Sequence, residues 1–326
     1  MTRMNSPLQS WILAARPKTL IAAVVPVIVT SAYAKFYFAK LALENTLLIT
    51  NSTQPMDNLL QVQPVQTMTW WIPTLVLLAS IFIQIGTNLV NDAVDYEKGA
   101  DTEKRIGPQR MTQSGVFSAK QVKWMAMGCF FLSALCGLPL VFHGGWPILF
   151  LGIVSMIMGY SYTGGPFPLA YLGLGDLFVV VFFGFVAILG LAFLLGLNLG
   201  LNLIVLSLQV GLLCTVLIAI NNLRDVDTDK LVNKKTLPVR FGKKFGRIEI
   251  ASLIGTSFLL QLYWLVKGQI WVFALPIIVL PLGVKIVKSV FTNEPSPVFN
   301  KFLGQSAGLH LLFGLLQAIG FVIQSI

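Results

Sequence analysis

The chain has 326 residues, of which 56% are hydrophobic and 11% are charged, and its formal net charge is +10. Soluble globular domains carry about a quarter of charged residues, so this composition excludes an ordinary soluble domain. Apolar runs of about 18 to 22 residues, long enough to cross the hydrocarbon of a bilayer, recur along most of the chain. We therefore predict an all-α, polytopic membrane protein with one integral domain over residues 1–326.

The first apolar run, about residues 19–39, follows a basic segment that includes Arg16 and Lys18. A secretory signal peptide is one interpretation, because residues 32–34 loosely fit a cleavage site. The apolar run continues beyond that point, and a basic flank is equally typical of a retained first span. We favour the retained membrane helix.

Residues 41–69 form a long polar connection that is low in charge and contains Pro55 and Pro64, which predicts a loop outside the membrane. The remaining apolar runs predict eight further spans. These spans cover about residues 70–95, 122–142, 146–163, 177–197, 201–223, 249–267, 270–288 and 304–325. A total of nine places the two termini on opposite sides of the membrane.

The distribution of basic residues predicts the orientation. If the N-terminus lies inside, all but three of the 23 Lys and Arg residues fall on the inner side, and the exceptions are Lys35, Lys40 and Lys267. The positive-inside rule then predicts an inner (cytoplasmic) membrane protein with a cytoplasmic N-terminus and the C-terminus outside. The inner charge favours membrane lipids with anionic head groups and anionic substrates, whereas no nucleic-acid-binding module is indicated.

Two polar clusters end apolar runs on the predicted inner side. The first acidic cluster lies in NLVNDAVDYEKGAD, residues 88–101, and the second in NNLRDVDTD, residues 221–229. Within each cluster most spacings are three or four, so on a helix these side chains share a face. We define the first acidic cluster as Asn88, Asn91, Asp92 and Asp95, and the second as Asn221, Asn222, Asp225 and Asp229.

The composition of these clusters points to a metal-bound anion. Mg²⁺ prefers oxygen ligands and is typically held by one or two carboxylates together with substrate phosphates. Two such clusters facing each other suit a magnesium diphosphate, and nearby Arg and Lys side chains would neutralise the remaining charge. Because the site would open among apolar helices, the rest of the ligand is expected to be a lipid tail, as in a prenyl diphosphate.

Loss of diphosphate from an allylic prenyl group leaves a cation that an electron-rich ring can attack. The aromatic faces of Tyr160 and Tyr162 are candidates to shelter that cation. The alternative is that both tyrosines are interfacial anchors. They open the Gly- and Pro-rich segment YSYTGGPFPLAYLGLGD, residues 160–176, which has no Lys or Arg, so we expect it to lie apart from the phosphate-binding surface.

Other interpretations of the acidic clusters remain open. Each cluster alone is compatible with a solvated helix end. A cation-coupled transporter or channel is the alternative from another class, although such proteins tend to place their site near the bilayer midplane on broken helices. Here every acid falls at a predicted helix end or in a loop, which favours an enzyme.

These motifs resemble those of the UbiA superfamily of intramembrane aromatic prenyltransferases, and most closely the branch that prenylates 1,4-dihydroxy-2-naphthoate in the menaquinone pathway. The resemblance covers nearly the whole chain. It rests on RPKTL (16–20), NLVNDAVDYEKGAD (88–101), RIGPQR (105–110), YTGGPFPLAYLGLGD (162–176), NNLRDVDTDK (221–230) and KKTLPVRFG (234–242).

The resemblance implies nine transmembrane helices around a central cavity. It also implies transfer of a polyprenyl group from polyprenyl diphosphate to 1,4-dihydroxy-2-naphthoate, with loss of CO₂ and diphosphate, giving a demethylmenaquinone. The 4-hydroxybenzoate prenyltransferases share the two acidic clusters, so the aromatic substrate rests on the branch resemblance alone.

Residue roles are implied in the same way. The resemblance implies catalytic roles for Asp92, Asp95, Asp225 and Asp229. It implies Mg²⁺ binding by these acids and Asn91, with Asn88, Asn221 and Asn222 lining the same clusters. The basic residues implied to cap the diphosphate are Arg105, Arg110, Lys235 and Arg240. Arg16 or Lys18 is a candidate partner for the substrate carboxylate, or else a topology signal. Gly99 stands where the superfamily's commonest first motif has an acid, and Asp101 follows two residues later, which leaves direct metal contact by Asp101 open.

Overall fold

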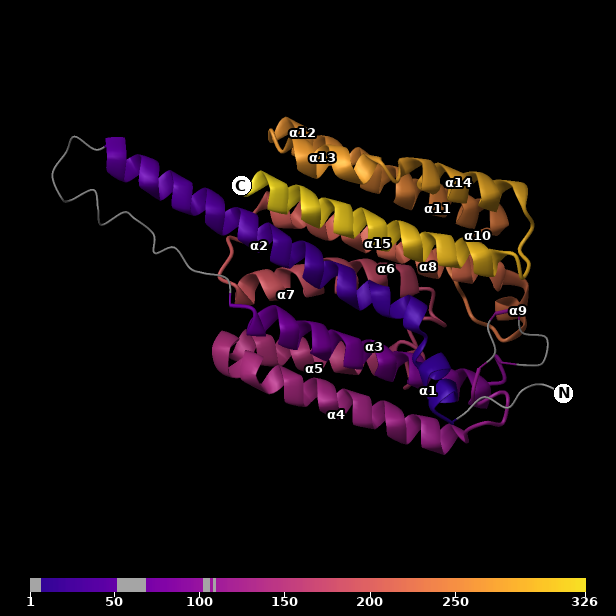
Figure 1. Ribbon diagram of the computed structural model, residues 1–326. Coiled ribbons are helices and arrows are strands. Elements are labelled where there is room, and N and C mark those ends of the chain that lie inside the picture. The colour runs from indigo at the N-terminus through magenta and orange to yellow at the C-terminus, as the bar shows by residue number, and fades with distance from the viewer. Residues whose placement is uncertain (1–6, 52–68, 102–105, 108–109) are drawn as a thin grey trace.

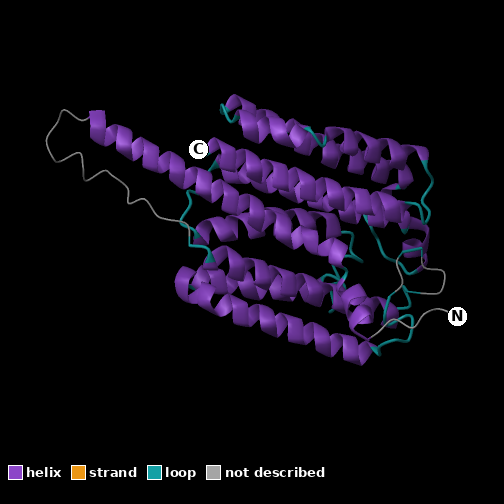
Figure 2. Ribbon diagram, in the orientation of Figure 1, coloured by secondary structure: helices purple, strands orange, loops and turns teal. Residues whose placement is uncertain are grey.

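The computed structural model describes residues 7–51, 69–101, 106–107 and 110–326, and this part of the chain is all-α (Figures 1 and 2). Its fold class is as predicted. In chain order the helices are α1 (Pro7–Ala15), α2 (Pro17–Asn51), α3 (Trp71–Glu97), α4 (Ala119–Gly144), α5 (Trp146–Ser161), α6 (Gly175–Val179), the π-helical η2 (Val180–Val186), α7 (Ala187–Leu194), α8 (Leu201–Arg224), α9 (Val226–Leu231), α10 (Leu237–Phe241), α11 (Lys243–Leu259), α12 (Gln261–Val266), α13 (Ile270–Ile277), α14 (Leu280–Thr292) and α15 (Phe299–Gln324).

The long helices run side by side in one bundle (Figure 1). α3 packs against α4, α2 against α15, α8 against α11, and α13 against α15. Large apolar side chains such as Phe131, Phe142 and Val266 remain exposed on its surface. Such an apolar surface suits the hydrocarbon of a bilayer. Helices also suit it, because they form their backbone hydrogen bonds internally.

The predicted count of nine spans is not confirmed. In the described residues, seven helices or continuous helix runs are long and apolar enough to cross a membrane, and an eighth is added if the bent pair α13 and α14 counts as one span. The remaining predicted span, 146–163, corresponds to α5, which has 16 residues. At about 1.5 Å per residue, α5 is shorter than the hydrocarbon thickness.

The predicted loop at residues 41–69 is wrong at its start, because α2 continues as a helix to Asn51. Residues 41–47 contain Leu, Ala and Glu, which favour helices, and Glu44 lies 3.7 Å from Lys40 one turn earlier. Residues 52–68 lie outside the described part of the chain.

A π-helical segment, η2, packs very closely against α8. A Cβ atom built on Gly184 would lie 2.5 Å from the Ser207 carbonyl oxygen, and one built on Gly211 would lie 2.9 Å from the Val180 carbonyl oxygen. Only glycine permits this approach of the two backbones. The wider π-helical turn changes the directions of the side chains that follow, and such turns are frequent at functional sites.

Both acidic clusters lie at one end of the bundle, where α3 and α8 end and α9 lies (Figure 1). α1 lies at this end, whereas the chain ends at the opposite end after α15. The two ends of the described chain are therefore on opposite sides of the bundle.

Candidate active site

Residues of both acidic clusters face one connected space. A cavity of about 470 Å³ has walls from each cluster, with Asn88, Asn91, Asp92 and Asn221 among them. A small polar pocket of about 50 Å³ is bordered by Asn91, Asp95, Asn221 and Asn222. The polar and aromatic residues that line both spaces are Arg16, Asn91, Arg110, Tyr162 and Asn221. The two spaces therefore adjoin.

The first acidic cluster is held by hydrogen bonds from several directions. The Asn88 amide donates to the Ala15 carbonyl and to the Thr19 hydroxyl, both at 2.9 Å, which ties α3 to the junction of α1 and α2. Asp92 accepts hydrogen bonds at 3.1 Å from the backbone N–H groups of residues 111–112. The basic loop after α3 is thereby folded back over the cluster.

Arg110 joins this loop to the first acidic cluster through two ion pairs. Its Nη2 lies 2.9 Å from Asp95 Oδ2, and its Nε lies 3.0 Å from Asp101 Oδ2, with all three side chains buried. Burial alone would lower the pKa of Arg110, but the two carboxylates outweigh it and raise the pKa. Asp101 borders neither space and is directed to Arg110.

In the second acidic cluster, Asp225 is paired with its neighbour in the sequence. Arg224 donates to both Asp225 carboxylate oxygens, at 2.8 and 2.6 Å, and also to Asn221 Oδ1 at 2.6 Å. Asp225 borders neither of the two spaces, whereas Asn221 borders both. The guanidinium group thus links two members of the cluster.

Asp229 is buried beside a lysine that the sequence analysis did not select. Lys234 Nζ lies 3.6 Å from Asp229 Oδ1, and Lys234 lines the polar pocket. Burial raises the pKa of Asp229 to about 6, with further contributions from Asp225 and Asp95, while Lys234 opposes the rise. Lys234 and Asp95 both line the polar pocket, so the Asp229–Lys234 ion pair brings the second acidic cluster to the pocket that the first one borders.

Residues 160–176, which we expected to lie apart from the phosphate-binding surface, line the polar pocket, with Tyr162, Thr163 and Asp176 among its walls. The Tyr171 hydroxyl donates to Asp95 Oδ1 at 2.9 Å, and the Lys98 ammonium lies 4.3 Å from the centre of the Tyr171 ring. Burial, reinforced by the Asp95 carboxylate, raises the pKa of Tyr171, so its hydroxyl stays protonated. Asp176 also lines the pocket and accepts a hydrogen bond from Asn222 at 3.3 Å.

Comparison with known proteins identifies the family. Residues 60–308 match the UbiA prenyltransferase family, which is more than half of the chain. The chain belongs to the UbiA prenyltransferase family. Among similar proteins, a "1,4-dihydroxy-2-naphthoate octaprenyltransferase" of Haemophilus influenzae is 32% identical, with 98% of each chain covered, and one of Escherichia coli is 32% identical over 96% of this chain and 94% of its own.

Solved structures show the same fold. A UbiA homolog from Aeropyrum pernix without ligand aligns with a TM-score of 0.63 at 12% identity, covering 93% of this chain and 98% of its own. A UbiA homolog from Archaeoglobus fulgidus bound to GPP and Mg²⁺ aligns with a TM-score of 0.58 at 15% identity, covering 94% and 99%. This UbiA prenyltransferase is thus a membrane protein of several spans.

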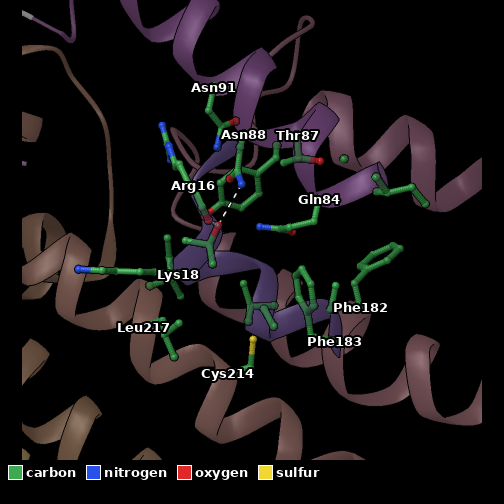
Figure 3. Close-up of a pocket in the computed structure, with 18 of the residues that line it drawn as sticks. Arg16, Lys18, Gln84, Thr87, Asn88, Asn91, Phe182, Phe183, Cys214 and Leu217 are labelled. Atoms are coloured by element: carbon green, nitrogen blue, oxygen red, sulfur yellow. Dashed lines mark hydrogen bonds between the residues drawn. The ribbon is translucent and has the colours of Figure 1, made fainter. Parts of the chain in front are cut away.

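The basic residues selected from the sequence of this UbiA prenyltransferase fall in different places. Arg110 and Arg16 line both spaces, while Lys18 lines only the larger cavity. In Figure 3, Arg16 reaches toward Asn91, whereas Lys18 extends away from the amide side chains. Arg16 has a positive φ of 53°, at the sharp turn between α1 and α2.

Two further basic candidates, Lys235 and Arg240, are described and do not line the two pockets. Lys235 is exposed, and its carbonyl accepts a hydrogen bond from Arg240 Nε at 3.0 Å. Arg240 also donates to the Leu172 carbonyl at 2.7 Å, so it holds the 160–176 segment to the 234–242 segment. Arg105 lies outside the described residues.

The two candidate tyrosines, Tyr160 and Tyr162, differ in their burial and in whether they line the cavity. Tyr160 is 39% exposed, whereas Tyr162 is buried and lines both spaces. The Tyr162 ring lies 5.5 Å from that of Phe178, which stacks on Phe182 at 4.3 Å. Phe178 and Phe182 also line the larger cavity, so a series of aromatic faces leads inward from the polar pocket.

The acids and amides of this site fit a divalent cation with partial protein coordination. Within the described residues, no group of three or more His, Cys, Asp and Glu side chains is arranged to hold a metal by itself. Asp176 Oδ1 and Asp229 Oδ2 are nevertheless buried without a hydrogen-bond partner in the described chain. Carboxylate and amide oxygens suit Mg²⁺, which takes its other ligands from water and substrate phosphate.

Proposed function

We propose that this UbiA prenyltransferase transfers a polyprenyl group from polyprenyl diphosphate to 1,4-dihydroxy-2-naphthoate in the inner (cytoplasmic) membrane. The products are CO₂, diphosphate and a demethylmenaquinone in its quinol form. We also infer that residues 1–326 act as one domain and that the site faces the cytoplasm. The names of the relatives in Haemophilus influenzae and Escherichia coli support the choice of acceptor.

One observation carries the proposal: both acidic clusters border a polar pocket that adjoins a larger, mainly apolar cavity. A prenyl diphosphate has the same division, with a polar head and a hydrocarbon chain. The head group would lie against the clusters and the chain among the helices.

The polar side of the site would hold the diphosphate. Arg110 and Lys234 line the polar pocket and carry positive charge toward it. The residues proposed to hold Mg²⁺ are Asn91, Asp92, Asp95, Asp225 and Asp229, supported by Asn88, Asn221 and Asn222. When bound, Mg²⁺ would neutralise the diphosphate charge and make it a better leaving group.

The aromatic side of the site would receive the prenyl cation. As the C–O bond to diphosphate breaks, its electron pair leaves with the diphosphate and positive charge develops on the allylic carbon. The faces of Tyr162 and Phe178 would stabilise this charge until the ring of the acceptor forms the new C–C bond. Arg16, at the edge of the cavity, would hold the acceptor carboxylate.

A product analysis tests this function. Membranes containing the protein are incubated with Mg²⁺, a polyprenyl diphosphate and either 1,4-dihydroxy-2-naphthoate or 4-hydroxybenzoate, and the products are identified by mass. We expect a decarboxylated, prenylated naphthalenediol, release of diphosphate, and loss of both with EDTA. Product from 4-hydroxybenzoate alone would assign the other aromatic substrate. Ion movement in proteoliposomes without any prenyl transfer would favour the transporter instead.

A further inference from the structure

A polar side chain lies halfway along the membrane-spanning part of α3. Gln84 is midway between Trp71 and Glu97, the ends of the helix. It lines the larger cavity together with Asn88, one turn closer to the acidic clusters. Figure 3 shows the Gln84 amide pointing into the cavity, toward the side where Arg16 and Asn88 lie.

The Gln84 amide has no protein hydrogen-bond partner among the described residues. On its own helix the cavity-lining neighbours of Gln84 include Ser80, Thr87 and Asn88, whereas Phe182 and Phe183 present aromatic rings to the same cavity. A polar group in the hydrocarbon region costs free energy unless it is paired, and polar residues inside membrane spans typically face a functional cavity. The amide is therefore available to a ligand in the cavity.

The distance of Gln84 from the acidic clusters along α3 matches the extent of a fused aromatic ring. Along α3, Gln84 lies about 6 Å deeper than Asn88 and about 12 Å deeper than Asp92, at about 1.5 Å per residue. The reacting allylic carbon is attached directly to the diphosphate, so the attacked ring carbon must come to within about 3.5 Å of it, near the level of Asn88. A fused ring that reacts there extends to the level of Gln84.

We propose that Gln84 binds the C4 hydroxyl of the naphthoate acceptor and thereby sets the specificity for it. This inference rests on the proposed function. With the carboxylate at C2 directed to Arg16, the hydroxyl at C4 points away from that end and deeper into the cavity. The amide of Gln84 hydrogen-bonds this hydroxyl, and the faces of Phe182 and Phe183 lie against the ring. The competing role for Gln84 is contact with the prenyl chain, which has no hydrogen-bonding group.

The test uses Gln84→Met, which keeps the length of the side chain and removes its hydrogen bonds. In the full-length protein, we expect the KM for 1,4-dihydroxy-2-naphthoate to rise about tenfold, equivalent to about 1.4 kcal/mol. The KM for polyprenyl diphosphate should stay unchanged. The inhibition constant of 1-hydroxy-2-naphthoate, which lacks the C4 hydroxyl, should also be the same in the variant and the parent.

The matched control is Gln324→Met, the same substitution in the last turn of α15, which does not border the cavity. It should leave all three constants unchanged. A higher KM for polyprenyl diphosphate in Gln84→Met would assign Gln84 to the prenyl chain and overturn the inference. An equal loss of affinity for 1-hydroxy-2-naphthoate would also overturn it. If the unmodified protein forms no prenylated naphthalenediol, it is the proposed function that fails.

Discussion

Arg224 donates to both carboxylate oxygens of the residue that follows it, Asp225, at 2.8 and 2.6 Å. The Arg224 side chain is almost fully buried, and it also donates to Asn300 Oδ1 at 2.6 Å. The Arg224 guanidinium therefore neutralises the Asp225 carboxylate and fixes its position. Any metal bound by Asp225 must share that carboxylate with Arg224 or displace it.

This pairing leads to a prediction for Asp225→Asn. The variant removes the negative charge that faces a buried guanidinium, so we expect the free energy of unfolding to fall by about 3 kcal/mol. We also expect prenyl transfer to fall below detection at saturating Mg²⁺. Unfolding in mixed detergent micelles and product formation measure the two effects. Full turnover by Asp225→Asn would remove the second cluster from the proposed mechanism.

A companion variant separates stability from catalysis. Asp92 borders the cavity and accepts hydrogen bonds from backbone N–H groups, and no buried cation among the described residues forms an ion pair with it. Asp92→Asn keeps one acceptor oxygen but leaves the other backbone N–H without an acceptor, so its stability loss should be about 1 to 2 kcal/mol, smaller than that of Asp225→Asn. We expect the same loss of prenyl transfer. Normal activity in this variant would contradict the role of Asp92.

Arg110 should contribute strongly to stability near the site, because it pairs with two buried carboxylates. In Arg110→Met, the buried carboxylates of Asp95 and Asp101 lose their common partner, which should cost about 3 to 5 kcal/mol. Lys123→Met is the control, because the Lys123 pair with Glu97 is solvent-exposed at 2.6 Å and should contribute about 0.2 to 1 kcal/mol. Similar losses from both variants would show that burial of the Arg110 pairs does not matter.

The raised pKa of Asp229 predicts a pH dependence when Mg²⁺ is removed with EDTA. Its pKa is about 6 in the fold against an ordinary value of 3.8, mainly because of burial, so the folded state binds the proton more tightly than the unfolded chain. The contribution to stability is full below about pH 4 and is lost as the pH rises through about 6. Unfolding between pH 4 and 7 measures this loss. Asp229→Asn should flatten the profile, and an unchanged slope would assign the effect to another group.

The close contact between η2 and α8 gives a prediction about packing. In Gly184→Ala, the new methyl group would meet the Ser207 carbonyl oxygen at 2.5 Å, so the helices must separate, at a cost of about 1 to 3 kcal/mol. In the control Gly190→Ala, the nearest atom is a Leu151 side-chain carbon at 3.8 Å. That variant should be neutral or more stable by up to about 1 kcal/mol. Equal thermal stability of the two variants would show that η2 can shift without cost.

The predicted membrane orientation can be tested with single cysteines. With the three native cysteines replaced, Ser325→Cys should react in intact cells with a thiol reagent that cannot cross the membrane. Ser296→Cys, in the connection between α14 and α15 near the acidic-cluster end, should react only after the cells are opened. The reverse pattern would place the site outside the cytoplasm.

The positions of the polar clusters could be predicted from the sequence, whereas the hydrogen-bond and ion-pair partners of their side chains could not. Acids and amides three and four apart at the end of an apolar run are visible without a structure, so both clusters could be located. The pairing of Asp225 with Arg224 depends on the rotamer of an arginine and was not predictable. Asp176 directly precedes an apolar stretch, so the signal used for the two clusters would have identified it only if extended to acids at the start of an apolar run.

The choice between neighbouring lysines illustrates the same limit. We selected Lys235, but Lys234 lines the polar pocket. The preceding Asn233 has a positive φ of 55°, and the Lys234 N–H donates to the Asp229 carbonyl at 2.9 Å, so the local turn decides which lysine faces inward. Tyr171 was missed because we judged its segment by charge, whereas it acts through a hydroxyl and a ring face.

The length of α2 has a practical consequence for imaging. Its 35 residues span about 52 Å, while the hydrocarbon layer measures about 30 Å, and Figure 1 shows its far end extending past the neighbouring helices. In electron micrographs of single particles, this rod should project from one side of the detergent belt. It would serve as a landmark for aligning a small particle that otherwise has little mass outside the micelle.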